Sequence, residues 1–171
     1  TLSPGDTLLG KYRVERTLGE GGMGVVLLAT HVELDQRVAL KLLHAQARQH
    51  PEVVERFLRE ARAAAKIRGN HAVKVLDVGR TDDGAPFMVM EYLEGRDLGE
   101  IHESEGPLPP EQTIDVVLEA CEGLAEAHAA GIVHRDLKPS NLFVARTPDG
   151  GTVVKVLDFG ISKLAPGPGS P

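Results

Sequence analysis

The sequence predicts an α+β protein in which a small, sheet-rich lobe precedes a mostly helical one. Three observations support this: short β-branched runs occupy residues 11–43, an apolar stripe at helical spacing follows Pro51, and a second such stripe follows Pro110. With 171 residues, 42% of them apolar, the chain is long enough for one ordinary domain or two small lobes. We place the boundary at Glu94-Gly95, so that residues 1–94 form the first lobe and residues 95–171 the second.

The first lobe is expected to hold a five-stranded antiparallel sheet and one main helix. Turn-forming residues separate three short runs, at 12–14, 25–29 and 38–43, and two more strands at 73–79 and 87–92 flank the turn at 82–84. A helix is expected over residues 52–68, because Pro51 can start it and Gly69 lies just beyond its end.

In the second lobe, Pro110 is expected to open a long helix that ends with Gly131 in the C′ position. Two short hairpins should follow this helix. We interpret Cys121, which lies on the apolar stripe of the helix, as a core residue. The stripe consists of Ile114, Val117, Leu118, Cys121, Leu124, Ala125 and His128.

Composition excludes several classes of function. The net charge is -6 and the pI is near 5.6, so no broad basic surface is available for nucleic acid or for an anionic membrane. The single Cys121 forms no internal disulfide, and no run of about 18 apolar residues occurs. We expect a cytoplasmic protein with no nucleic-acid partner and no membrane contact from this segment. His31, His44, His50, His71 and His102 lack the spacing of metal ligands.

A glycine-rich string, Gly19-Glu20-Gly21-Gly22-Met23-Gly24, leads into Val25-Val26. In dinucleotide-binding folds such glycines connect a strand to a helix, whereas here they lie between two strands. Residues without Cβ let backbone N–H groups approach phosphate oxygens. Taken alone, the string is equally compatible with a plain glycine-rich hairpin.

Three further strings contain polar residues typical of catalysis. Lys41 ends Val38-Ala39-Leu40-Lys41 in an apolar strand, where an ammonium group requires a partner. The second string is His134-Arg135-Asp136-Leu137-Lys138-Pro139-Ser140-Asn141, which is too specific for a purely structural interpretation. The third is Asp158-Phe159-Gly160, in which the carboxylate follows a strand and can take Mg²⁺ through oxygen.

Together these four strings resemble the protein kinase family, and most closely the bacterial kinases related to eukaryotic Ser/Thr kinases. The resemblance implies a two-lobed kinase-like fold. It also implies transfer of the γ-phosphate of ATP to Ser or Thr hydroxyls of proteins, with Mg²⁺ as the metal and Mn²⁺ as an alternative.

By the same resemblance, Lys41 pairs with Glu60 on the following helix and holds the α and β phosphates. Asp136 accepts or orients the proton of the attacking hydroxyl, and Lys138 neutralises charge on the transferred phosphate. Asn141 and Asp158 bind the metal ion.

The resemblance further implies an adenine site. Its apolar roof is formed by Leu18, Val26 and Ala39, and its floor by Phe143. Glu91 to Leu93 form the hinge, Met90 is the gatekeeper, and Asp97 reaches the ribose. Most of these residues are also ordinary core residues, and small-molecule pockets are mostly apolar, so the two interpretations agree.

The match runs from Tyr12 to Leu164, whereas in the family further activation-segment residues and large-lobe helices follow. We therefore expect a piece of a kinase, cut after the third string, that is inactive alone and prone to self-associate. The alternative is a kinase-like module that binds nucleotide or a partner and transfers nothing. The five intact residues Lys41, Glu60, Asp136, Asn141 and Asp158 favour the enzyme.

Overall fold

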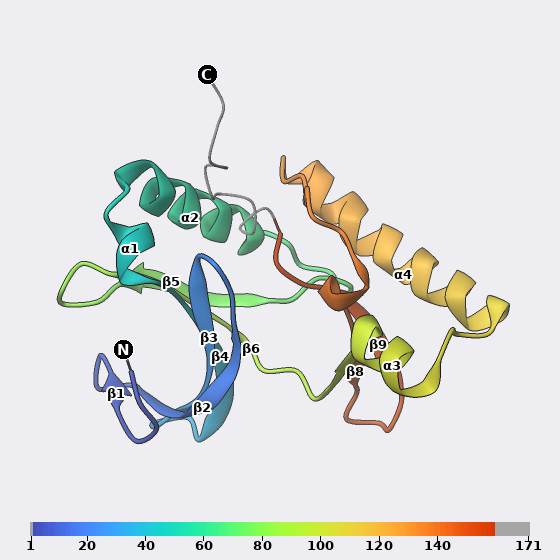
Figure 1. Ribbon diagram of the computed structural model, residues 1–171, viewed down its shortest axis with the longest axis horizontal. Coiled ribbons are helices and arrows are strands. Elements are labelled where there is room, and N and C mark those ends of the chain that lie inside the picture. The colour runs from blue at the N-terminus through green and yellow to red at the C-terminus, as the bar shows by residue number, and fades with distance from the viewer. Residues whose placement is uncertain (1, 160–171) are drawn as a thin grey trace. The chain divides into compact units, whose positions relative to one another are not determined.

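A computed structural model describes residues 2–159, and these form two compact units (Figure 1). The first unit contains residues 2–62 and 75–92, and the second contains residues 63–74 and 93–159. The stretch 63–74 therefore groups with the second unit although both of its neighbours along the chain belong to the first.

The first unit is built on a six-stranded antiparallel sheet with the order β1-β2-β3-β4-β6-β5. The strands are β1 (Thr7–Leu8), β2 (Tyr12–Glu20), β3 (Gly24–His31), β4 (Gln36–Leu43), β5 (Val75–Arg80) and β6 (Pro86–Glu91). The predicted count of five strands was wrong, because the two-residue β1 pairs with β2. Leu9 turns the chain there with a φ of 53°, a left-handed conformation that a leucine does not signal in the sequence.

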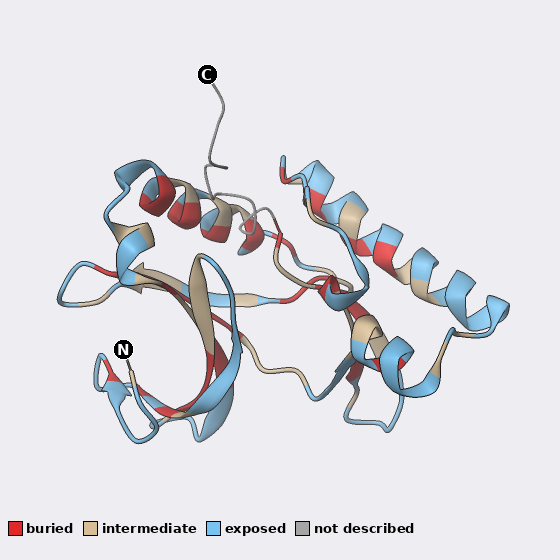
Figure 2. Cartoon of the chain, in the orientation of Figure 1, coloured by how far each residue is buried: buried red, intermediate tan, exposed pale blue. Residues whose placement is uncertain are grey.

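Two helices, α1 (Ala45–Arg48) and α2 (Pro51–Ala64), follow β4. The apolar side of α2 is buried, as Figure 2 shows. The helix ends four residues earlier than predicted, because Lys66 and Ile67 donate to the carbonyls three residues before them and so tighten the chain into a different turn. The buried residues are Val53, Val54, Phe57, Leu58, Ala61 and Ala64.

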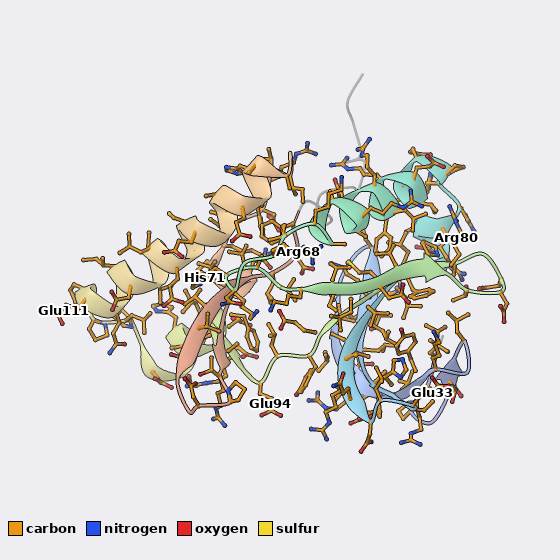
Figure 3. All side chains as sticks on the ribbon, turned by 180° about the vertical axis from the view of Figure 1, so that it is seen from behind. Glu33, Arg68, His71, Arg80, Glu94 and Glu111 are labelled. Atoms are coloured by element: carbon orange, nitrogen blue, oxygen red, sulfur yellow. The ribbon has the colours of Figure 1, made fainter. Side chains whose placement is uncertain are left out.

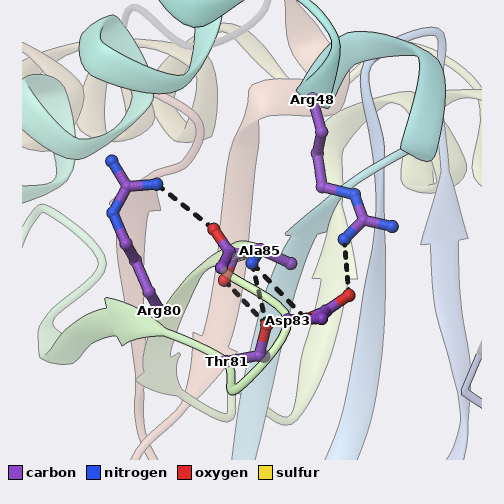
Figure 4. A network of polar contacts seen from close by, with 6 residues as sticks. Arg48, Arg80, Thr81, Asp83 and Ala85 are labelled. Carbon is purple, nitrogen blue, oxygen red and sulfur yellow. Dashed lines mark hydrogen bonds and ion pairs between the residues drawn. The ribbon is translucent and has the colours of Figure 1, made fainter.

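The predicted turn between β5 and β6 is confirmed, and Gly84 has a φ of 80°. Figure 4 shows the polar contacts around this turn. The Thr81 hydroxyl donates to Asp83, and Arg48 Nη1 donates to Asp83 Oδ2 at 2.9 Å. These contacts lower the pKa of the Asp83 carboxyl to about 2, the Thr81 hydrogen bond contributing most and the Arg48 hydrogen bond next. A short polar network therefore ties this turn to α1.

The second unit combines two helices, α3 (Leu98–Glu105) and α4 (Pro110–Ala129), with a three-stranded sheet. Its strands are β7 (Gly95–Asp97), β8 (Leu142–Arg146) and β9 (Thr152–Val156), paired in the order β7-β8-β9. Between α4 and residue 159 the structure contains one hairpin, β8–β9, so the two short hairpins predicted after the helix are not both found in this stretch. Residues 134–141 instead form a loop and the short 3₁₀ turn η1 (Pro139–Asn141). Arg135 has a φ of 65° and Pro139 lacks an N–H, and neither suits a strand.

Helix α4 buries a different side from the one that its apolar stripe predicts. Its buried residues are the small Ala120, Gly123 and Ala127, and a Cβ at Gly123 would lie 2.2 Å from the carbonyl oxygen of His71. Small side chains are needed where two backbones approach this closely.

The predicted apolar stripe of α4 is largely solvent-exposed, with Ile114, Val117 and Leu118 each more than half exposed (Figure 2). Cys121 is exposed as well, so its interpretation as a core residue was wrong. Gly131 does end the helix with a φ of 78°.

The stretch 69–71 is held against α4 by acidic side chains. Gly69 N donates to Glu126 at 2.7 Å, and the two ring nitrogens of His71, labelled in Figure 3, each lie 3.3 Å from a carboxylate, of Glu119 and of Glu122. The described helices include none that is long and apolar enough to cross a bilayer.

Candidate active site

The glycine-rich loop lies between β2 and β3, as predicted. Gly21 N donates to the carbonyl of Gly24 at 3.0 Å and closes the turn. A Cβ at Gly24 would lie 2.1 Å from the carbonyl oxygen of Leu42, so glycine is required there, whereas a Cβ at Gly21 or Gly22 would meet nothing within 4 Å. Gly21 and Gly22 are exposed, so the tip of the loop is open, and the Gly22 N–H rather than the bonded Gly21 N–H is the group offered to an anion.

Strand register brings four predicted nucleotide residues to one face of the six-stranded sheet. Lys41 is paired with Val26 on one side and with Met88 on the other, and Ala39 is paired with Met90. Residues directly opposite one another, and residues two apart on a strand, share a face. Val26, Ala39, Lys41 and Met90 therefore share one face, while Leu40 and Val89 belong to the buried cluster on the other.

Leu18 and Glu20 lie on the same arm of the loop, and both are exposed. Leu18 is 37% exposed, which leaves its apolar surface open to a ligand. Glu91, next to Met90, ends β6 and is opposite Val38, and Leu93 follows as a half-buried residue.

Glu60 is on α2 as predicted, but its ion pair is with Arg56. Arg56 Nε lies 3.0 Å from Glu60 Oε1, and the two side chains are only 22% and 13% exposed. The second oxygen, Glu60 Oε2, is buried without a hydrogen-bond partner among the described residues. The expected pair with Lys41 stays a prediction, and the orphaned oxygen marks the place where an ammonium group would be stabilised.

The loop 134–141 presents two of the predicted catalytic groups together. Lys138 Nζ lies 3.3 Å from Asp136 Oδ2. Asn141 is buried, and its side-chain nitrogen donates to the backbone carbonyl of Asp136 at 2.8 Å, which fixes the position of Asp136 on the loop.

His134 anchors this loop to the end of β9. The ring is 3% exposed, its Nε2 lies 2.7 Å from the carbonyl oxygen of Leu157, and its Nδ1 accepts from Asp136 N at 3.3 Å. These two partners assign the ring proton to Nε2. Leu157 N also donates to the carbonyl of Asn141 at 2.9 Å, so that the loop and the residue before Asp158 are bonded twice.

Asp158 has a φ of 54°, in the left-handed region that is rare outside glycine. Such conformations concentrate at functional sites, where the surrounding contacts determine them. Phe159, the next residue, is buried and packs edge to face on His134 with ring centroids 5.4 Å apart. Gly160 lies outside the described residues.

Asn141 and Asp158 are chemically suited to a magnesium ion. The bond to Asp136 uses the amide nitrogen of Asn141, which leaves its amide oxygen as the ligand atom. Mg²⁺ typically takes one or two protein oxygens and completes its shell with phosphate and water. Residues 2–159 contain no group of three or more His, Cys, Asp and Glu that would form a metal site of their own.

Asp97 and Phe143 are opposite one another in the β7–β8 pair. Asp97 also serves as the N-cap of α3, where its Oδ1 accepts from Glu100 N at 3.0 Å in a capping box. This structural role was not predicted, and it accounts for the aspartate independently of any ribose contact.

Two further residues near the predicted site were missed. Arg56 is the partner of Glu60, and His44 Nε2 lies 2.9 Å from the carbonyl oxygen of Gly21 in the glycine-rich loop. The i,i+4 spacing of Arg56 and Glu60 on one helix was a usable signal for the first. A ring bonded to a backbone carbonyl has no sequence signature.

Comparison with known proteins agrees with this arrangement. The serine/threonine-protein kinase pkn3 of Myxococcus xanthus is 44% identical over 160 residues, which are 94% of this chain and 29% of that protein. The serine/threonine-protein kinase PknB of Mycobacterium tuberculosis is 40% identical over 156 residues, 90% of this chain and 24% of that protein. The chain thus spans less than a third of these curated relatives.

Among solved structures, the crystal structure of the Mycobacterium tuberculosis PknI kinase domain matches with a TM-score of 0.79 and 32% identity. The match covers 94% of this chain and 64% of that domain. A crystal structure of Rad53 in complex with AMP-PNP, at 24% identity and a TM-score of 0.75, supports the fold alone. The protein kinase domain model matches residues 12–170, and the chain belongs to that family.

Proposed function

We propose that the chain is the nucleotide-binding and catalytic-loop part of a bacterial Ser/Thr protein kinase, which transfers the γ-phosphate of ATP to protein hydroxyls. The observation that carries the proposal is the placement of Asp136 and Lys138, whose charged groups lie 3.3 Å apart on a loop that His134 and Asn141 anchor. A carboxylate beside an ammonium group provides a proton acceptor and a phosphate-neutralising charge within one site.

In the proposed reaction the Ser or Thr oxygen forms a bond to the γ-phosphorus, and the bond from that phosphorus to the bridging oxygen breaks, so that ADP leaves. Asp136 orients the hydroxyl and takes its proton, and Lys138 offsets negative charge on the transferred group. Asn141 and Asp158 would hold Mg²⁺, or Mn²⁺ in its place, and the ion would neutralise charge on phosphate oxygens. The substrate class follows from Lys138, which tyrosine kinases usually lack at this position.

The first unit supplies most of the nucleotide contacts in this proposal. The open tip offers the Gly22 N–H to phosphates. Lys41 reaches the α and β phosphates from the sheet face that it shares with Val26, Ala39 and Met90. In this unit, Leu18 and Glu91 are the proposed adenine contacts. In the second unit, Leu93 and Phe143 are assigned to adenine and Asp97 to the ribose by the family resemblance alone. We place this activity in the cytoplasm, where ATP is available and a lone cysteine stays reduced.

The test uses the full-length protein, radiolabelled ATP and a generic protein substrate. Asp136→Asn is expected to lower turnover by about 10²- to 10⁴-fold with little change in ATP affinity, because the carboxylate acts on the hydroxyl. Asp115→Asn, the same change on the exposed side of α4, is the matched control and should leave turnover unchanged. Equal losses in turnover and ATP affinity would make Asp136 a structural residue.

Two further outcomes separate the alternatives. Phosphoserine or phosphothreonine in the product supports the proposal, whereas dominant phosphotyrosine contradicts the role of Lys138. Tight binding of Mg²⁺-ATP by calorimetry without any transfer would instead identify a binding module.

We also propose that residues 1–171 in isolation self-associate and transfer phosphate poorly. Ile114, Val117 and Leu118 are 58%, 51% and 59% exposed on one helix, and contiguous apolar surface of this kind favours association. Sedimentation should show oligomers that Leu118→Glu reduces, and a monomeric, fully active piece would contradict this.

A further inference from the structure

His44 is bonded to the tip of the glycine-rich loop in two ways. It directly follows β4, and its backbone N donates to the carbonyl of Met23 at 2.9 Å. Its ring Nε2 lies 2.9 Å from the carbonyl oxygen of Gly21, which makes Nε2–H the donor. One residue outside the loop therefore restrains the loop at both ends of its tip.

Within residues 2–159, few other contacts restrain this tip. A Cβ at Gly21 or at Gly22 would meet no atom within 4 Å, so neither residue packs against the rest of the unit. The remaining backbone bond within the turn runs from Gly21 N to the carbonyl of Gly24 at 3.0 Å. Glycine adopts positive and negative φ about equally readily, so a free Gly21–Gly22 peptide would rotate with little cost.

The ring bond determines which way that peptide faces. In a trans peptide the C=O and N–H groups point in opposite directions, and residues 2–159 contain no cis peptide. With the Gly21 oxygen held on His44, the Gly22 N–H must point away from His44. If the peptide rotated by half a turn, it would present a carbonyl oxygen in place of an N–H group, and an oxygen repels a phosphate.

The Glu20 carboxylate is the second acceptor near the ring. Glu20 Oε1 lies 3.5 Å from His44 Nε2, farther than the Gly21 oxygen, and the Glu20 side chain is 67% exposed. An exposed pair of this kind adds little energy, so the shorter bond to the backbone oxygen determines the orientation of the ring.

We propose that His44 is a positioning residue for the nucleotide phosphates, because its ring holds the Gly21–Gly22 peptide with the N–H turned to the ligand. This role rests on the proposed ATP site and adds a residue to it. The loss of His44 should weaken phosphate binding and not adenine binding. Its hydrogen bonds among residues 2–159 include two to the phosphate-binding loop and none to a residue assigned to adenine.

The test compares His44→Leu with His44→Gln in the full-length protein. The amide nitrogen of a glutamine reaches about as far as Nε2 and still donates to the Gly21 oxygen, whereas leucine has no donor. His50→Leu is the matched control, because His50 is exposed and its ring Nδ1 lies 3.4 Å from the exposed carboxylate of Glu52. Calorimetry gives the Kd of Mg²⁺-ATP and of adenosine, and steady-state kinetics give KM for ATP and for the peptide substrate.

His44→Leu should weaken ATP binding by about two- to tenfold, the range of one net hydrogen bond, with adenosine affinity and peptide KM unchanged. His44→Gln and His50→Leu should remain within twofold of the parent. Equal ATP affinity in His44→Leu and the parent would overturn the inference, and so would a parallel loss of adenosine binding.

A second measurement does not depend on nucleotide. In the ligand-free protein, NMR order parameters of the Gly21 and Gly22 amides should fall in His44→Leu and be restored in His44→Gln. If His44→Leu loses this order but the parent binds no ATP, the proposed function is refuted and the loop restraint remains. Unchanged order in His44→Leu would refute the restraint itself.

Discussion

Replacing Arg56 by methionine tests whether Lys41 is the second partner of Glu60. The change removes the guanidinium and keeps an unbranched apolar stem. Removing one partner of a fully buried ion pair costs about 3 to 5 kcal/mol, whereas exposed pairs are worth about 0 to 1 kcal/mol. With the two side chains 22% and 13% exposed, we expect a cost of about 1 to 3 kcal/mol if nothing replaces Arg56.

Lys41 would reduce that cost by taking over the carboxylate, whose Oε2 is already buried without a partner. The loss in Arg56→Met should therefore be larger when Lys41→Met is already present, by about 1 kcal/mol. Hydrogen exchange of the α2 amides in the full-length protein gives the local opening free energies for the parent, both single variants and the double variant.

Additive losses, within about 0.5 kcal/mol, would show that Lys41 does not reach Glu60 and would refute the predicted pair. Arg59→Met is the control, because Arg59 is exposed on the same helix. If Arg56 and Lys41 compete for Glu60, Arg56→Met should also tighten ATP binding, because the Lys41–Glu60 pair then forms more often.

Two further predictions follow from local geometry. Gly24→Ala should destabilise the β3–β4 pair by about 1 to 3 kcal/mol in hydrogen exchange, because its Cβ would lie 2.1 Å from the Leu42 oxygen, whereas Gly22→Ala meets no atom and should cost far less. The Asp83 carboxyl, with its pKa lowered from 3.8 to about 2, stabilises the folded state above pH 4, and this contribution is lost as the pH falls towards 2. In Asp83→Asn the free energy of unfolding should therefore fall less steeply between pH 4 and pH 2 than in the parent. The same pH dependence in both proteins would contradict the Asp83 network.

Elements with a clear hydrophobic periodicity, or with marked turn residues, were predictable from the sequence. Strands β2, β3 and β4, the helices that begin at Pro51 and Pro110, and the turn at Gly84 all follow local patterns that packing does not override. Strand β1 was missed because two residues carry no period, and its turn depends on a left-handed leucine.

Side-chain partners were less predictable than elements. An apolar stripe on α4 indicated a buried side, yet Ala120, Gly123 and Ala127 are the buried residues, because the approach of the backbone at His71 selects small side chains. The assignment of Glu60 to Lys41 ignored a competing arginine one turn earlier on the same helix. The strings at 134–141 and 158–160 predicted which residues belong to the site, but not the hydrogen bonds that hold these two parts of the chain together.

Two of these hydrogen bonds, both made by Leu157, help to hold the backbone at Asp158 in position. Leu157, the residue before it, accepts from His134 and donates to Asn141, so any displacement of this backbone breaks both hydrogen bonds. At about 1 kcal/mol each, the two bonds together lower the population of the displaced form by roughly thirtyfold. A substitution that removes the bond from His134, such as His134→Leu, would raise that population severalfold while leaving the Asp158 carboxylate unchanged. The carboxylate would then spend more of its time away from the position that it has in this structure.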